Sequence, residues 1–277
     1  MQWFKSFSIV LSLLFFSTSV TLAKTAKLNQ GQTLIELAQA QQTTEFEFAR
    51  KQGATVSVTP DAKSFYVLWK PENYTDKTPV VVSLHGHGSW SVRDFQIWHP
   101  YLKNRGYAFI GIQWWKGTGE KTSDYLKPEE IYRSIDHIFR EKNIQSPTLL
   151  HGFSRGAANS YAVAALDATT GNRYFNLFIA NAGKANEGYP PNQAIQDGKM
   201  GSSPLAGTRW ITVAGGKDPN QDRDGISGMR ETQKWIKRYG GEVVLAIEDP
   251  NGNHGVFHRN PKNVYQALDK FAELLKK

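Results

Sequence analysis

The chain has 277 residues, a formal net charge of +8, 40% hydrophobic residues and no cysteine. Without cysteine, it cannot form disulfides, use a thiol nucleophile or bind a metal through thiolates. Its 33 lysines and arginines are scattered along the chain rather than grouped in runs, which favours a solvated basic surface over a nucleic-acid-binding site.

The first 23 residues have the pattern of a secretory signal peptide. A lysine precedes an apolar run over 7–16, and small residues lead to Ala23, after which we expect cleavage. The alternative is an uncleaved N-terminal anchor, but the apolar run is short for a membrane span. We therefore expect an exported bacterial protein, secreted or periplasmic, with 24–277 as a single domain and no membrane span in the mature chain.

Short apolar or alternating runs predict the strands. They lie at 45–49, 55–59, 65–69, 80–84, 108–112, 148–152, 176–180, 210–214 and 243–247. The later runs are continuously apolar, as in parallel strands that are buried on both faces. The first two runs follow each other without a helix between them, which predicts an antiparallel edge.

Helical patterns alternate with the later strands. Apolar stripes at helical spacing run through 127–142, 226–241 and 260–277, and Pro128 and Pro261 stand at the first helical positions. Strands that alternate with helices predict an α/β fold, with a mostly parallel sheet covered by helices on both faces. The long irregular stretch at 182–206 is expected to form a wall of the functional site.

The sequence GFSRG ends one of these strands and opens a helix, with Ser154 at its centre. This is the G-x-S-x-G nucleophile elbow, in which glycines permit a tight, strained turn that projects the serine hydroxyl. A serine that merely caps the helix is the alternative. The position between an apolar strand and a helix favours the nucleophile.

A serine nucleophile needs a base, and the base needs a carboxylate to orient it. This arrangement predicts the order serine, acid, histidine, with each residue following its own strand. Asp218 follows the strand at 210–214, and His254 lies in a glycine-rich loop after the strand at 243–247. Ser154, Asp218 and His254 are therefore the predicted catalytic triad.

Other residues nearby leave alternatives open. Asp222 or Asp224 could supply the carboxylate, and His258 could be the base. The stretch 220–231 also has the acidic spacing of a calcium loop, although Asn220 replaces the usual first aspartate. An acidic turn before the next helix is the simpler interpretation, so no metal or other cofactor is expected.

Two backbone N–H groups are expected to form the oxyanion hole. One belongs to Arg155, directly after the nucleophile, and the other to His87 in the His-Gly-x-Gly loop that follows the strand at 80–84. His85 and His87 could suggest a metal site, but no third ligand lies near them in the sequence.

The chain resembles the α/β-hydrolase superfamily, over about residues 60–277. It is similar to secreted esterases of the polyhydroxybutyrate depolymerase-like and feruloyl or acetylxylan esterase-like types, and to prolyl oligopeptidase-type catalytic domains. The matching motifs are His85-Gly86-His87-Gly88, Gly152-Phe153-Ser154-Arg155-Gly156, Gly215-Gly216-Lys217-Asp218 and Asn253-His254-Gly255. Two features depart from these relatives: Ala157 stands where many have a second glycine, and the cysteine common in the depolymerase-like enzymes is missing.

The resemblance implies a serine hydrolase that cleaves carboxylic esters through an acyl-enzyme. Trp90, Trp114 and Trp115 follow strand ends and could line a pocket for an aromatic acyl group or a sugar ring, or could simply pack over the sheet. The expected partner is an ester, small or attached to a polymer. A serine peptidase and a non-catalytic binding protein on the same fold are the alternatives.

Overall fold

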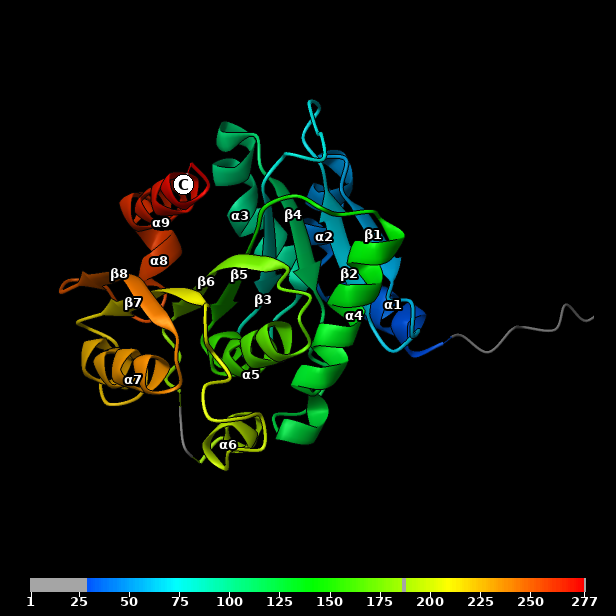
Figure 1. Cartoon of the computed structure of the whole chain (residues 1–277). Helices are drawn as coiled ribbons and strands as arrows, with labels where there is room; N and C mark the ends of the chain where they lie inside the picture. Colours follow the sequence, from blue (N-terminus) through cyan, green and yellow to red (C-terminus); the bar gives the residue numbers. More distant parts are fainter. Residues whose placement is uncertain (1–28, 186–187, 277) are drawn as a thin grey trace, which may run out of the picture.

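The computed structural model describes residues 29–185 and 188–276, which form one layered α/β unit (Figure 1). The predicted signal peptide at 1–23 lies outside these residues. Within the described part of the chain, every helix is too short or too polar to cross a lipid bilayer.

An eight-stranded sheet forms the centre of the molecule, in the order β1-β2-β4-β3-β5-β6-β7-β8. β1 and β2 pair antiparallel with each other, β2 pairs antiparallel with β4, and all other neighbours are parallel. The strands are Thr55–Val58 (β1), Phe65–Trp69 (β2), Val80–Leu84 (β3), Ala108–Ile112 (β4), Thr148–Phe153 (β5), Phe175–Asn181 (β6), Arg209–Gly215 (β7) and Glu242–Asp249 (β8). The mostly parallel sheet with an antiparallel edge confirms the predicted fold class.

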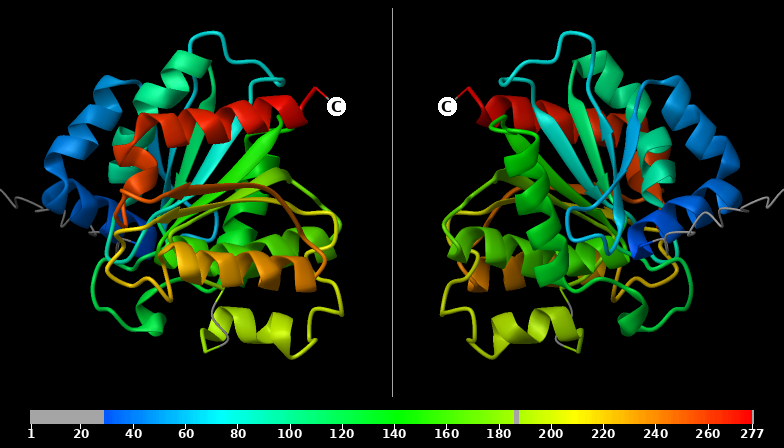
Figure 2. Two further views of the ribbon diagram at one scale, coloured as in Figure 1. Left: turned by 90° about the vertical axis from the view of Figure 1, so that its left-hand side faces the viewer. Right: turned by 90° about the vertical axis from the view of Figure 1, so that its right-hand side faces the viewer.

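Helices cover both faces of the sheet (Figure 2). One face packs against Pro128–Glu141 (α4), Arg155–Thr169 (α5) and Ile226–Arg238 (α7), and Pro190–Gln196 (α6) packs on α5. The other face packs against Gln30–Gln41 (α1), Thr43–Lys51 (α2), Ser91–Arg105 (α3), Val256–Arg259 (α8) and Pro261–Leu274 (α9). A short 3-10 helix, Thr122–Asp124 (η1), lies in the long connection after β4.

The continuous apolar runs of the central strands are explained by this layering. Val81 faces the cluster under α1–α3, whereas its neighbours Val80 and Val82 face the cluster under α4 and α5. Because side chains alternate across a strand, a strand covered on both faces must be apolar at every position. Because β3, β5, β7 and β8 run in the same direction, their carboxyl ends lie at the same end of the sheet.

The predicted strand at 45–49 is wrong, because these residues belong to helix α2. Phe46 and Ala49 are buried, whereas Glu47 is exposed, which is the i, i+3 spacing of a helix face. The alternation of Glu and Phe over only five residues is compatible with the two-residue period of a strand and with the 3.6-residue period of a helix. Packing of Phe48 against Phe95 and His99 of α3 is the tertiary contact that favours the helix.

Five helices of the described chain were not predicted from the sequence: α1, α2, α3, α6 and α8. α1 and α2 precede the sheet, and α3 contains Pro100 within its span, a residue that normally ends a helix. The stretch at 182–206, expected to be irregular, contains the short helix α6. Prolines at the start of α6 fit the first helical turn, where the missing N–H costs nothing.

Candidate active site

Ser154 occupies a sharp turn between β5 and α5. Its φ of 52° and ψ of −118° lie outside the ordinary regions for a residue with a side chain, so the backbone is strained there. The backbone N–H of Ser154 donates to the carbonyl of Asn181 at the end of β6, over 2.8 Å. This is the geometry of a nucleophile elbow.

Glycines are required around this turn because backbone segments meet there. A Cβ on Gly156 would lie 2.2 Å from the carbonyl oxygen of Leu84, and one on Gly183 would lie 2.2 Å from that of Ser154. A Cβ on Gly152 would lie 2.6 Å from the carbonyl oxygen of Gly156. The close approach of β3, β5 and α5 therefore excludes side chains at these positions.

Asp218 and His254 are hydrogen-bonded to each other. The distance from His254 Nδ1 to Asp218 Oδ2 is 2.7 Å, and Asp218 Oδ1 accepts the backbone N–H of Asn220 over 2.8 Å. The Asp218 side chain is fully buried, whereas 31% of the His254 side chain is exposed. A buried carboxylate thus orients an imidazole that solvent can reach.

The alternative acids and base have other partners. Asp222 is exposed at the surface, and Asp224 forms an ion pair with Arg223, with 2.7 Å between Oδ2 and Nη2. His258 packs edge-on against Trp98, and burial lowers its pKa to about 3. Of the candidate acids, Asp218 is the one hydrogen-bonded to His254.

The loop after β3 brings His87 to the cavities that Ser154 lines. The N–H of Gly88 donates to the Tyr125 hydroxyl over 2.9 Å, and that hydroxyl lies 2.7 Å from His87 Nδ1. Among the described residues, the backbone N–H groups of His87 and Arg155 have no recorded hydrogen-bond acceptor. Both are therefore available as donors for the oxyanion hole.

The side chain of Arg155 is held by three groups. Its Nη1 lies 2.9 Å from His87 Nδ1 and donates to the carbonyl oxygen of Glu120 over 2.9 Å. Its guanidinium also covers the ring of Tyr125, 4.2 Å from the centroid. Because arginine can only donate, Nδ1 of His87 must be the acceptor, which leaves the ring proton on Nε2.

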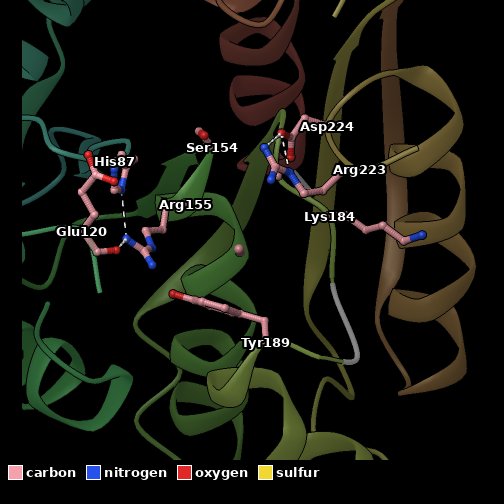
Figure 3. Close-up of a pocket in the computed structure, with 10 residues that line it drawn as sticks. His87, Glu120, Ser154, Arg155, Lys184, Tyr189, Arg223 and Asp224 are labelled. Atoms are coloured by element: carbon pink, nitrogen blue, oxygen red, sulfur yellow. Dashed lines mark hydrogen bonds and ion pairs between the residues drawn. The ribbon is translucent and has the colours of Figure 1, made fainter. Parts of the chain in front are cut away.

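Ser154 and His87 line two adjoining cavities. The first, of about 420 Å³, is here named the Arg155 cavity (Figure 3); it is lined by His87, Glu120, Ser154, Arg155, Ala158, Gly183, Lys184, Tyr189, Arg223 and Asp224. The second, of about 600 Å³, is named the His254 cavity; its lining includes Gly86, His87, Arg93, Asp94, Phe153, Ser154, His254 and Arg259. Ser154 therefore stands between a cavity that contains Arg155 and a cavity that contains His254.

The structure does not place the predicted tryptophans in these cavities. Trp90 and Trp114 are only 2% and 1% exposed, so neither side chain can contact a substrate in this arrangement. Trp114 donates its indole N–H to the His85 carbonyl over 3.0 Å, and Trp115 packs edge-on against Trp90. These aromatic side chains support the loops around the site. The aromatic residue that lines the Arg155 cavity is instead Tyr189, directly before α6.

A buried polar network lies behind the elbow. Ser83 donates to Asp94 over 2.6 Å, and its oxygen lies 3.1 Å from His151 Nδ1. His151 Nε2 lies 3.2 Å from the side-chain amide nitrogen of Asn181. The backbone carbonyl of Asn181 accepts the N–H of Ser154. Burial raises the pKa of Asp94 to about 7 and lowers that of His151 well below its usual value. His151 is therefore neutral, and the network braces β5 and β6 behind Ser154.

Asp218, Asp224 and His254 are close enough for their ligand atoms to lie within 4.8 Å of one another. Asp224 already forms an ion pair with Arg223, and Asp218 already forms a hydrogen bond with His254. Glu231, the twelfth position of the possible calcium loop, pairs with Lys234. Asp224 is the one acidic residue of 220–231 in this described cluster, and the other acidic positions of the possible calcium loop do not join it.

Comparison with known proteins gives the family context. No protein-family model matches the chain, and no curated protein matches it by sequence. Among solved structures, esterase B from Lactobacillus rhamnosis, inhibited by a tributyrin phosphonate, is similar with a TM-score of 0.57 and 14% identity, over 88% of this chain and 96% of that one. The chain has the α/β-hydrolase fold.

Two further structures share this α/β-hydrolase fold. Est1E from Butyrivibrio proteoclasticus with bound ferulic acid has a TM-score of 0.54 and 15% identity, over 76% of this chain and 95% of that one. Brefeldin A esterase, a bacterial homologue of human hormone-sensitive lipase, has a TM-score of 0.57 and 12% identity, over 90% of this chain and 87% of that one. At these identities the likeness concerns the fold.

Sequence reasoning missed the residues that shape the cavities. Tyr125, Glu120 and Tyr189 carry no motif, and they reach the site from loops that are distant from Ser154 in the sequence. Arg155 was predicted for its backbone N–H alone, although the residue directly after Ser154 at the turn also has its side chain in the cavity.

Proposed function

We propose that this protein is a serine hydrolase that cleaves carboxylic esters. The observation that carries the proposal is the hydrogen bond from His254 to the buried Asp218 at the wall of a cavity that also contains Ser154. An imidazole oriented by a carboxylate, next to a serine on a strained elbow, is the arrangement that activates a hydroxyl nucleophile.

In the proposed reaction, the Ser154 oxygen attacks the ester carbonyl carbon while His254 takes the hydroxyl proton. The negative charge that develops on the carbonyl oxygen is stabilised by the backbone N–H groups of His87 and Arg155. His254 then gives its proton to the departing alcohol, which leaves an acyl-enzyme. Water, activated by the same imidazole, attacks the acyl-enzyme and releases the acid.

The two cavities suit the two parts of an ester. His254 must reach the oxygen of the leaving alcohol, and it lines only the larger of the two cavities. The alcohol therefore occupies the His254 cavity, and the acyl group extends from Ser154 into the Arg155 cavity. The open arrangement supports esters with bulky or polymer-linked alcohols, and the expected export of the chain places such substrates outside the cytoplasm.

Labelling with a fluorophosphonate, followed by peptide mass spectrometry, tests the nucleophile. We expect the adduct on Ser154, and we expect its complete loss in Ser154→Ala with little change in the unfolding temperature. Ester hydrolysis should fall by several orders of magnitude in the same variant. Unchanged turnover in a folded Ser154→Ala protein would exclude the proposed mechanism.

A further inference from the structure

Arg155 presents a fixed positive charge beside the nucleophile. Among residues 29–185 and 188–276, no aspartate or glutamate forms an ion pair with its guanidinium. One of its nitrogens, Nη1, binds His87 and the Glu120 carbonyl, and the guanidinium has five N–H donors in total. The cation is thus held in place by neutral groups and retains donors on its other nitrogens.

The other charges around the Arg155 cavity leave this cation dominant. Asp224 is neutralised by Arg223, and Lys184 extends away from the cavity (Figure 3) to the carbonyl of Asp222. Glu120 supplies its backbone carbonyl to Arg155, and its residue is exposed to solvent, where water screens the carboxylate.

Tyr189 closes the cavity on the side of Arg155. Burial raises the pKa of the Tyr189 hydroxyl, and the positive charge of Arg155 opposes that rise. Figure 3 shows the hydroxyl end of Tyr189 directed toward the guanidinium. A neutral hydroxyl and a guanidinium side by side form a site that suits a carboxylate, because both can donate hydrogen bonds to its oxygens.

We propose that Arg155 binds a carboxylate carried by the acyl group, so that the preferred substrates are half-esters of dicarboxylic acids. This proposal rests on the proposed function, because the acyl group is placed in the Arg155 cavity by the role of His254. A charge-assisted hydrogen bond in a partly enclosed site contributes roughly 1.5–3 kcal/mol, equivalent to about a 10- to 100-fold preference.

The test compares substrates that differ only in the distal charge. Hydrolysis of monoethyl glutarate, neutral ethyl pentanoate and cationic ethyl 5-aminopentanoate is followed by chromatography of the released acids. We expect the wild type to have the highest kcat/KM on the half-ester and the lowest on the cationic ester. Monoethyl succinate and monoethyl adipate then measure how far the cation lies from the scissile carbonyl.

Variants separate substrate binding from loop support. In Arg155→Met, the half-ester should lose about 10- to 100-fold more kcat/KM than the neutral ester, and Arg155→Lys should recover part of the preference. Arg230→Met, which removes an exposed cation that lines neither cavity, should keep the wild-type ratio. Equal losses on all three esters in Arg155→Met, or no preference in the wild type, would overturn the proposal.

Binding of glutarate keeps this test independent of catalysis. Calorimetry on Ser154→Ala should detect glutarate binding that is about tenfold or more weaker in Ser154→Ala/Arg155→Met. Binding without any ester hydrolysis by the wild type would retain the carboxylate site and reject the serine hydrolase. Hydrolysis without the charge preference, and without glutarate binding, would retain the serine hydrolase and reject the carboxylate site.

Discussion

Asp218 and His254 meet across 2.7 Å, with the carboxylate fully buried and the imidazole partly exposed. The second carboxylate oxygen accepts the N–H of Asn220, so the carboxylate cannot rotate without losing one of its two bonds. The pair therefore fixes both the orientation of the imidazole and the nitrogen that carries its proton.

We expect Asp218→Asn to lower kcat by about 10⁴-fold with little effect on folding. An amide of the same size fills the buried space. Its NH₂ group would donate to Nδ1 of His254, so that the ring proton moves to Nε2 and the imidazole cannot accept the serine proton. Steady-state kinetics together with circular dichroism check this result. Asp222→Asn is the matched control. A comparable loss of kcat in that variant would contradict the assignment of the orienting role to Asp218.

Gly156→Ala should destabilise the fold. The new Cβ would lie 2.2 Å from the carbonyl oxygen of Leu84 and 2.7 Å from that of His85. Both are backbone atoms, which cannot move aside as a flexible side chain can. We expect a loss of about 3 kcal/mol and a fall of roughly 5–10 °C in Tm. In the control Gly255→Ala, the nearest neighbour is the flexible Arg259 side chain at 3.2 Å, so a similar fall there would contradict the steric explanation.

Stability should decrease as the pH falls from about 6.5 toward 4, in part because of His85. Burial lowers the pKa of His85 to about 4, so in this range the unfolded chain takes up a proton that the folded chain does not. The slope of unfolding free energy against pH should become shallower in His85→Gln by at most about 1.4 kcal/mol per pH unit.

Chemical denaturation at a series of pH values measures this slope. Buried His151 and His258 act in the same direction, whereas the raised pKa of Asp94 acts in the opposite one, so the comparison must be made against the wild type. An identical slope in wild type and His85→Gln would show that His85 takes up its proton equally in both states.

Calcium should leave the stability unchanged. Glu231 pairs with Lys234, and Asp224 with Arg223, so a calcium ion would have to break two ion pairs to gain ligands. We expect the Tm in millimolar calcium and in excess chelator to agree within about 1 °C, because a ligand that does not bind the folded state cannot raise its stability. A clear increase with calcium concentration would restore the calcium-loop interpretation of 220–231.

The sequence by itself determined the sheet, the elbow and the order of the expected triad. Continuous apolar runs of about five residues, rich in valine and isoleucine, are typical of strands buried on both faces. Glycines around Ser154 mark a turn that no side chain could enter. These signals are local, so they can be read without knowing which segments meet. The same local reading failed at 45–49, where a five-residue alternation fits a strand until α3 supplies a partner for a helix.

Only the tertiary structure decided which residues share a cavity. The local sequence does not decide which of Asp218, Asp222 and Asp224 contacts the histidine. The return of the chain through β8 places His254 against Asp218. Trp114 lies after a strand end, as a pocket residue would, yet the chain folds it under the His85 loop. Such contacts join loops far apart in sequence, and their geometry depends on the packing of the sheet rather than on any local pattern.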